Sequence, residues 1–269
     1  MHPDTTVQNK IKTRYTELPF IEPWQLYMVF RDRGSILLES PAGPEKTARY
    51  SFVLFEPVAE FVVKDGFFTC RGLLNRQFQT PRPLRELRDI MGAFAQEPVQ
   101  GLGPFQGGLA GLFSYDFVHY IERLPRTAVD DLSIPDAHLY LYDRLFLIDH
   151  SKKKTFAILC EGLREGSDKY LSEMERAFKE AQMIETDYTI PPVKRDIDIN
   201  HDMGKDQYMR IVQRAKEYIR AGDIFQANLS QRFWTEFDIN RAWQLYLVLR
   251  RINPSPFAFF ADMGGYCLV

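Results

Sequence analysis

The chain has 269 residues, 45% of them hydrophobic, which is enough for one large or two ordinary domains with a sizeable core. Its 34 basic and 36 acidic side chains nearly cancel, and no run of like charge is long enough to track a nucleic acid. No apolar stretch approaches the roughly 20 residues that span a bilayer, and three scattered cysteines without a Cys-x-x-Cys pair argue against a disulfide framework and a zinc site. We therefore expect a cytoplasmic globular protein with neither a nucleic-acid nor a membrane partner.

The first seventy residues predict one short helix followed by several strands. Apolar residues at helical spacing lie between Pro23 and Gly34, which are typical of a helix start and a helix stop. Asp65-Gly66 is a strong hairpin signal. The strands predicted on this basis cover residues 35–40, 49–55, 58–63 and 67–70.

The middle of the chain combines two amphipathic helices with extended segments. Apolar periodicity predicts helices at residues 84–94 and 170–181. Residues 107–116 form a glycine-rich strand pattern, in which glycines indicate bulges or close backbone approach. Residues 139–148 are expected to pair with residues 155–160 through a turn at residues 150–153.

A linker or domain crossing is predicted at residues 185–200, where apolar periodicity fades. Pro191-Pro192 cannot lie inside a helix or a central strand. A helix follows, and Gly222 is expected to end it in a left-handed conformation. The apolar face of this helix consists of Tyr208, Val212, Ala215 and Ile219.

Residues 225–233 alternate between apolar and polar side chains, which predicts a strand with one polar face. Periodicity by itself favours a surface strand whose polar face is solvated. A further helix is predicted at residues 242–249, with Asp238 or Asn240 as its cap and with Pro254 and Pro256 beyond its end.

The last predicted elements are a strand at residues 257–261, a turn at residues 263–265 and a returning strand at residues 266–269. Native domains rarely end on an apolar strand without a polar tail, because that leaves an incompletely paired edge. We therefore expect a truncated chain.

Five collinear segments resemble the motifs of chorismate-utilising enzymes, namely component I of anthranilate synthase and of aminodeoxychorismate synthase. The helix-to-strand segment at residues 218–233 resembles one family signature, and Asn-Pro-Ser-Pro-Phe-Ala-Phe-Phe at residues 253–260 resembles the next. Further upstream, the resemblance covers residues 37–40 with 49–52, residues 107–116 with 122–125, and residues 131–132 with 135–136.

This resemblance implies an α+β fold of two packed, mainly antiparallel β-sheets flanked by helices, truncated in its second half. Residues 1–190 would be the N-terminal domain of component I, and residues 191–269 the start of an incomplete chorismate-binding domain. It also implies a buried polar ladder beside a ligand cavity at residues 225–233, where periodicity alone favours a solvated surface strand.

The implied reaction is the amination of chorismate, with magnesium as cofactor and with ammonia from a glutamine amidotransferase subunit. The family's chorismate and magnesium ligands correspond to positions downstream of Val269, so we assign no catalytic or metal-binding residue and expect the chain alone to be inactive. The histidines lack metal-ligand spacing and are interpreted as structural ones: His119, His138, His150 and His201.

Two features favour aminodeoxychorismate (para-aminobenzoate) synthase component I, which serves folate biosynthesis. They are Asn228 and the pair Phe257-Ala258, where anthranilate synthases favour Tyr-Met. The alternatives are anthranilate synthase component I, which serves tryptophan biosynthesis, and a non-catalytic ligand-binding module.

The resemblance also implies a tryptophan pocket, since in related enzymes the Leu-Leu-Glu-Ser and Pro-Ser-Pro motifs form the wall of one. Without a family in view, Leu-Leu-Glu-Ser is simply a strand that enters a turn. In the pocket, Ser40 would hydrogen-bond the polar end of the ligand, and Arg49 would bind a carboxylate or pair with Glu39. The candidate pocket residues are Ser40, Thr47, Ala48, Arg49, Tyr50, Pro256, Phe257 and Ala258.

Overall fold

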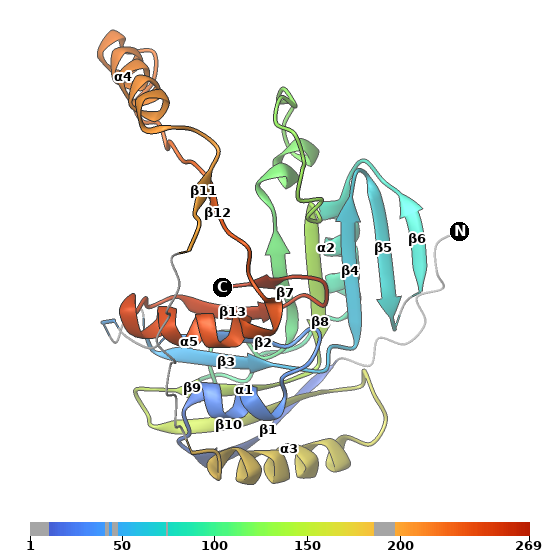
Figure 1. The fold of residues 1–269 in the computed structure, drawn as a ribbon. Helices are drawn as coiled ribbons and strands as arrows, with labels where there is room; N and C mark the ends of the chain where they lie inside the picture. Colours follow the sequence, from blue (N-terminus) through green and yellow to red (C-terminus); the bar gives the residue numbers. More distant parts are fainter. Residues whose placement is uncertain (1–10, 41–42, 45–47, 74, 186–196) are drawn as a thin grey trace. The chain divides into compact units, whose positions relative to one another are not determined.

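The computed structural model describes residues 11–40, 43–44, 48–73, 75–185 and 197–269, and the chain divides into two units (Figure 1). The first unit combines the part before residue 189 with Ala242–Val269, and the second is Thr189–Arg241. The predicted linker residues Pro191 and Pro192 lie outside the described residues. The family domain boundary expected at residue 190 stays a prediction.

The first unit is built on a seven-stranded sheet in which all neighbouring strands are antiparallel. Its strands are β1 (Lys12–Pro19), β2 (Ile36–Glu39), β3 (Tyr50–Leu54), β9 (Arg144–Asp149), β10 (Lys154–Glu161), β13 (Ala258–Asp262) and β14 (Cys267–Leu268). They are arranged in the order β1-β10-β9-β3-β2-β13-β14. This order places β2, which contains Leu-Leu-Glu, between β3 and β13. The other candidate residues of the predicted pocket lie on these two strands or next to them.

A second, five-stranded sheet packs against the first, and it is also antiparallel throughout. Its strands are β4 (Ala59–Lys64), β5 (Phe67–Gly72), β6 (Arg76–Gln79), β7 (Gly108–Phe113) and β8 (Ala137–Tyr142), in the order β6-β5-β4-β8-β7. The hairpin predicted between β4 and β5 is confirmed, because Asp65 and Gly66 both have positive φ (49° and 81°), as a tight two-residue turn requires.

The two sheets are joined through Asp143, which separates β8 from β9. The prediction that residues 139–148 form one strand paired with residues 155–160 is therefore wrong in its first half. β9 does pair with β10, but β8 belongs to the other sheet and pairs with β4 and β7. The mainly apolar run, interrupted only by Asp143-Arg144, did not reveal this change of sheet, because both halves of it are buried.

All of the predicted helices of the first unit are present. They are α1 (Pro23–Val29), α2 (Pro83–Ala93), α3 (Ser167–Gln182) and α5 (Ala242–Ile252), with a 3-10 helix η1 (Tyr115–Tyr120) after β7. α1 ends before the predicted glycine stop, and Gly34 (φ 76°) instead lies in the turn before β2. Among the described residues, no helix is long and apolar enough to cross a membrane.

The buried side chains form three clusters that follow these layers. The first joins α1, α3 and α5 to one face of the seven-stranded sheet, through Tyr27, Phe146, Phe178 and Trp243 among others. The second fills the space between the two sheets, and the third lies between the five-stranded sheet, α2 and η1. Each fully buried Leu, Ile or Phe contributes roughly 1.5–3 kcal/mol, so these clusters account for most of the stabilisation.

The second unit contains much less regular structure. It has the helix α4 (Lys205–Ala221), the short antiparallel pair β11 (Asn200–His201) and β12 (Phe233–Trp234), and the 3-10 helix η2 (Ile239–Arg241). Gly222 ends α4 with φ 82°, as predicted. The strand predicted at residues 225–233 is wrong except at its end, where Phe233 pairs with His201 and the carbonyl of Arg232 accepts from the N–H of Asp202 at 3.3 Å. Residues 224–231 pair with no strand in the described part of the chain, and a strand requires a neighbour for its N–H and C=O groups.

Candidate functional site

Ser40 lies where three segments of the first unit meet. Its hydroxyl is 2.8 Å from the carbonyl oxygen of Pro256, which is 216 residues away, and 3.1 Å from that of Tyr50. Its backbone N–H donates to Ser51 Oγ at 3.0 Å. The geometry follows from the sheet order, since Ser40 directly follows β2 and both neighbouring strands begin beside it.

The other candidate pocket residues surround this point unequally. An added Cβ at Gly43 would lie 3.1 Å from Ala48 Cβ and 3.0 Å from Pro256 Cβ, so these two candidates flank the same turn. Ala258 pairs with Glu39 across the strands. Phe257 is 72% exposed and presents its ring to solvent. Thr47 lies outside the described residues.

Arg49 and Tyr50 are half-buried at the start of β3. Arg49 forms a two-point ion pair with the buried carboxylate of Asp149, at 2.9 and 3.3 Å, and its guanidinium lies 4.8 Å from the centre of the Tyr50 ring. Two roles were predicted for Arg49, and one of them, an ion pair with Glu39, is therefore wrong. The pocket for an amino acid stays a prediction, with its segments brought together as that prediction requires.

Glu39 is instead held by two residues of α5 that are one helical turn apart. Its carboxylate accepts hydrogen bonds from the Tyr246 hydroxyl (2.6 Å) and from Nε and Nη2 of Arg250 (2.9 and 2.7 Å). Burial raises the pKa of Glu39, and the cation of Arg250 opposes that effect. Because the pair is buried, removal of either partner would leave an uncompensated charge. Tyr246 and Arg250 were not predicted, although their i, i+4 spacing on a helix is a usable signal.

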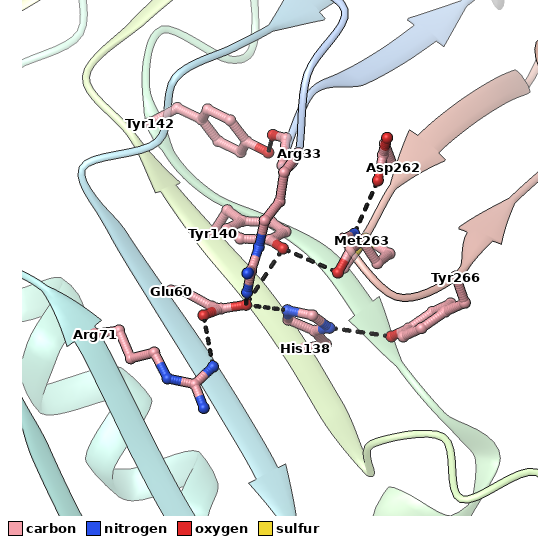
Figure 2. A network of polar contacts seen from close by, with 11 residues as sticks. Arg33, Glu60, Arg71, His138, Tyr140, Tyr142, Asp262, Met263 and Tyr266 are labelled. Carbon is pink, nitrogen blue, oxygen red and sulfur yellow. Dashed lines mark hydrogen bonds and ion pairs between the residues drawn. The ribbon is translucent and has the colours of Figure 1, made fainter. Parts of the chain in front are cut away.

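A second polar network centres on Glu60 of β4 and joins the two sheets (Figure 2). Its carboxylate accepts hydrogen bonds from Arg33, Arg71 and His138, each at 2.9 Å, and a longer one from Tyr140 at 3.3 Å. On its other side, the His138 ring lies 3.1 Å from the Tyr266 hydroxyl, in the residue before β14. The single hydroxyl proton of Tyr140 is shared between Glu60 and the carbonyl of Met263, which lies 3.2 Å away. The network thus ties the β13–β14 turn to the five-stranded sheet.

Charge states in this network follow from burial and hydrogen bonding. Burial alone would raise the pKa of Glu60, but hydrogen bonds from Arg71, Arg33 and His138 lower it to about 2. Burial lowers the pKa of His138 and outweighs the attraction of Glu60. A neutral His138 therefore donates its Nε2–H to the carboxylate and accepts from the Tyr266 hydroxyl at Nδ1. As predicted for this residue, His138 is a structural histidine.

In the described part of the chain, no group of three or more His, Cys, Asp or Glu side chains could hold a metal ion. The magnesium expected for the whole enzyme stays a prediction, and we derive no step through it. Cys70, Cys160 and Cys267 are free thiols.

The fold and the five collinear segments define the class of protein: the chain belongs to the family of chorismate binding enzymes, which it matches over residues 34–269. It is 31% identical to anthranilate synthase component 1 of Acetivibrio thermocellus, covering 92% of this chain and 52% of that protein. It is 29% identical to aminodeoxychorismate synthase component 1 of Bacillus subtilis, covering 87% and 49%.

The chain also resembles the crystal structure of anthranilate synthase component I from Streptococcus pneumoniae, with a TM-score of 0.67 and 26% identity over 92% of this chain and 54% of that one. This likeness and the antiparallel sheets confirm the predicted α+β fold class. The chain spans about half the length of these relatives.

Proposed function

We propose that this chain is the N-terminal part of an enzyme that aminates chorismate. The observation that carries the proposal is the family match over residues 34–269, which includes the segments at residues 37–40, 218–233 and 253–260. Relatives that span the same region are named for the two aminating reactions, anthranilate and aminodeoxychorismate synthesis.

The product that we propose is 4-amino-4-deoxychorismate, an intermediate of folate biosynthesis. Asn228 and Phe257-Ala258 support this choice by their resemblance to the aminodeoxychorismate synthases. Anthranilate is the alternative product, which is supported by the names of the Acetivibrio thermocellus and Streptococcus pneumoniae relatives. Ammonia from a glutamine amidotransferase subunit, magnesium and a cytoplasmic setting belong to the same proposal.

Product analysis of a fusion tests this proposal directly. The chain is joined to the part of the Bacillus subtilis relative that it does not match, and the fusion is incubated with chorismate, ammonium and magnesium. We expect the fusion to aminate chorismate, and no product from the chain alone. Because the joined half sets the product, the choice between the two reactions is tested by inhibition: loss of the fusion's activity on addition of tryptophan would support the anthranilate synthase alternative. A folded fusion that consumes no chorismate would contradict the proposal and favour a non-catalytic binding module.

We also propose that the segments around Ser40 and Pro256 bind tryptophan. Support comes from the convergence of three segments on one turn, one of them 216 residues from Ser40, beside the apolar Ala48 and the half-buried Tyr50. Calorimetric titration with tryptophan should show binding that Ser40→Phe abolishes, because the larger side chain fills the turn. Ser172→Phe on the exposed face of α3 is the matched control and should bind normally. Absence of binding to the unaltered chain would refute the pocket.

A further inference from the structure

His150 lies two hydrogen bonds away from Ser40. Its ring nitrogen Nε2 is 2.7 Å from the Ser51 hydroxyl, and this hydroxyl accepts the backbone N–H of Ser40 at 3.0 Å. The backbone N–H of His150 donates to the carbonyl of Arg49 at 2.9 Å, which fixes the residue beside β3. A continuous chain of hydrogen bonds therefore runs from the His150 ring through Ser51 to Ser40.

The Ser51 hydroxyl sets the direction of these bonds. Ser51 is fully buried in β3, and among the described residues its hydroxyl has only Ser40 and His150 as polar partners. Because the Ser40 N–H already donates to the hydroxyl oxygen, Nε2 of His150 is the acceptor left for the hydroxyl proton. A neutral His150 that carries its own proton on Nδ1 accepts this bond, so the buried hydroxyl is satisfied as donor and as acceptor.

Protonation of His150 removes this acceptor. The imidazolium carries a proton on both ring nitrogens, so Nε2 can only donate, and the described residues offer the Ser51 hydroxyl proton no other acceptor. A buried donor without a partner destabilises the arrangement that contains it. Rotation of the Ser51 side chain relieves the conflict, and it also withdraws the hydroxyl oxygen from the Ser40 N–H. The Ser40 turn thus loses one of its bonds when His150 becomes charged.

The surroundings of His150 favour its neutral form at pH 7. Burial has the largest effect and lowers the pKa of the ring below its ordinary value of 6.5, and the carboxylate of Glu22 opposes that effect. The ring packs edge-on against Phe20, with 5.8 Å between the ring centres. The neighbouring charges come from three places: Glu22 at the start of α1, Arg49 before β3, and Asp149, Lys152 and Lys153 around the β9–β10 turn. Protonation is therefore expected as the pH falls below 6.5.

We infer that His150 is a positioning residue for the predicted tryptophan pocket: in its neutral form it holds the Ser40 turn in the binding conformation, and its protonation releases that turn. The inference rests on the proposed tryptophan site and adds acid sensitivity to it. A ligand that binds only the chain with neutral His150 loses up to about tenfold in affinity for each pH unit below the pKa of that residue. Tryptophan itself stays a zwitterion in weak acid, so it contributes no titration of its own.

Calorimetric titration of the full chain with tryptophan at pH 7.5, 6.5 and 5.0 tests this role. The unaltered chain should bind roughly threefold or more weakly at pH 5.0 than at pH 7.5. His150→Gln should keep its affinity within about twofold across this range, because an amide oxygen accepts the Ser51 hydroxyl proton and is not protonated. His201→Gln, at an exposed histidine of the second unit, is the matched control and should keep the pH dependence of the unaltered chain. A dependence that came from Glu39, whose pKa is raised by burial, would persist in His150→Gln.

Hydrogen exchange gives a readout that needs no ligand. The protection of the Ser40 amide, expressed relative to an unstructured peptide at the same pH, should fall about threefold or more between pH 7.5 and pH 5.0 in the unaltered chain. It should stay constant in His150→Gln. His150→Phe, which keeps a ring beside Phe20 but accepts no hydrogen bond, should show the low protection at every pH. Circular dichroism at each pH establishes that the chains stay folded.

Two results would overturn the inference. One is a tryptophan affinity or a Ser40 protection that does not change with pH in the unaltered chain. The other is an equal pH dependence in the unaltered chain and in His150→Gln. Absence of tryptophan binding at every pH would instead refute the pocket, and the exchange measurement would still decide whether His150 controls the Ser40 turn. A failure of the pocket and a failure of this inference are therefore distinguishable.

Discussion

The strand β9 and the helix α4 both have clear apolar sequence patterns, but β9 is buried and α4 is exposed. All six residues of β9 are buried, with β3 and β10 on either side, helices over one face and the second sheet over the other. All 17 residues of α4 remain at least partly exposed. Periodicity therefore specifies which face of an element favours burial, and the surface that covers that face has to come from elsewhere in the fold or from a partner.

The largest expected effect is on the buried side of this comparison. Phe146→Ala in β9 should lower the free energy of unfolding by about 3–5 kcal/mol, because the ring is fully buried beside Phe55 and its removal leaves a cavity. Urea denaturation followed by tryptophan fluorescence measures the change. A loss below about 1 kcal/mol would mean that the helix-covered core is loosely packed.

The Glu60 network should produce the next largest effect, and it should depend on pH. The folded pKa of about 2 lies below the ordinary value of 4.5, so ionised Glu60 stabilises the fold at neutral pH and this contribution disappears as the pH falls from about 5 toward 2. Taken in full the shift would correspond to about 3 kcal/mol, but the guanidiniums of Arg33 and Arg71 are 59% and 60% exposed and are screened by solvent, so we expect about 1–2 kcal/mol. Glu60→Gln should therefore be less stable at pH 7, and the difference from the unaltered chain should shrink in acid.

Glu161→Gln is the matched control, since its carboxylate forms a surface ion pair with Arg14. Urea titrations at pH 7, 4.5 and 3 compare the three proteins. The loss of stability in Glu60→Gln could also stay constant across this pH range. That result would show that the charge of the Glu60 carboxylate is not the source of its stabilising effect.

A smaller loss is expected where one hydrogen bond closes the turn of the predicted pocket. Ser40→Ala removes the bond to the carbonyl of Pro256 and should cost about 0.5–1.5 kcal/mol. Ser172→Ala on α3, which loses only a bond to its own helix, should be nearly neutral. If the two variants were equally stable, the hydrogen bond of Ser40 would make no measurable contribution to the free energy of unfolding.

The smallest effect is expected at the exposed end of the comparison. Phe225→Ser should change the free energy of unfolding by less than about 0.5 kcal/mol, because the ring contacts solvent. The same urea titration applies. A loss comparable to that of Phe146→Ala would show that the second unit is packed in solution.

Local chemistry made much of the fold predictable. The Asp65-Gly66 hairpin and the glycine end of α4 were found because each requires a backbone conformation that few residues adopt. The change of sheet at Asp143 was missed, since the strands on both sides of it are buried and mainly apolar. The one available signal was the charged pair Asp143-Arg144 within an otherwise apolar run.

The site was predictable only as far as the resemblance reached. It placed Ser40 and Pro256 together, and the sheet order supplies the physical reason. The ion pair of Glu39 with Arg250 joins residues 211 positions apart, and the bond of Glu60 to His138 joins residues 78 apart. Pairings at such separations leave no trace in local periodicity, so they require the structure.

The pairing of β1 with β10 has a consequence for the order of synthesis. Arg14 of β1 bonds to Glu161 of β10, 147 residues later in the chain. At about 5–20 residues per second on the ribosome, β1 emerges roughly 7–30 s before its partner strand exists. During that interval its charged residues, Lys12, Arg14 and Glu17, discourage pairing with other nascent chains, as charges on an unpaired strand generally do. These charges contribute little to the stability of the folded sheet, but they protect β1 from pairing with other chains until β10 has been synthesised.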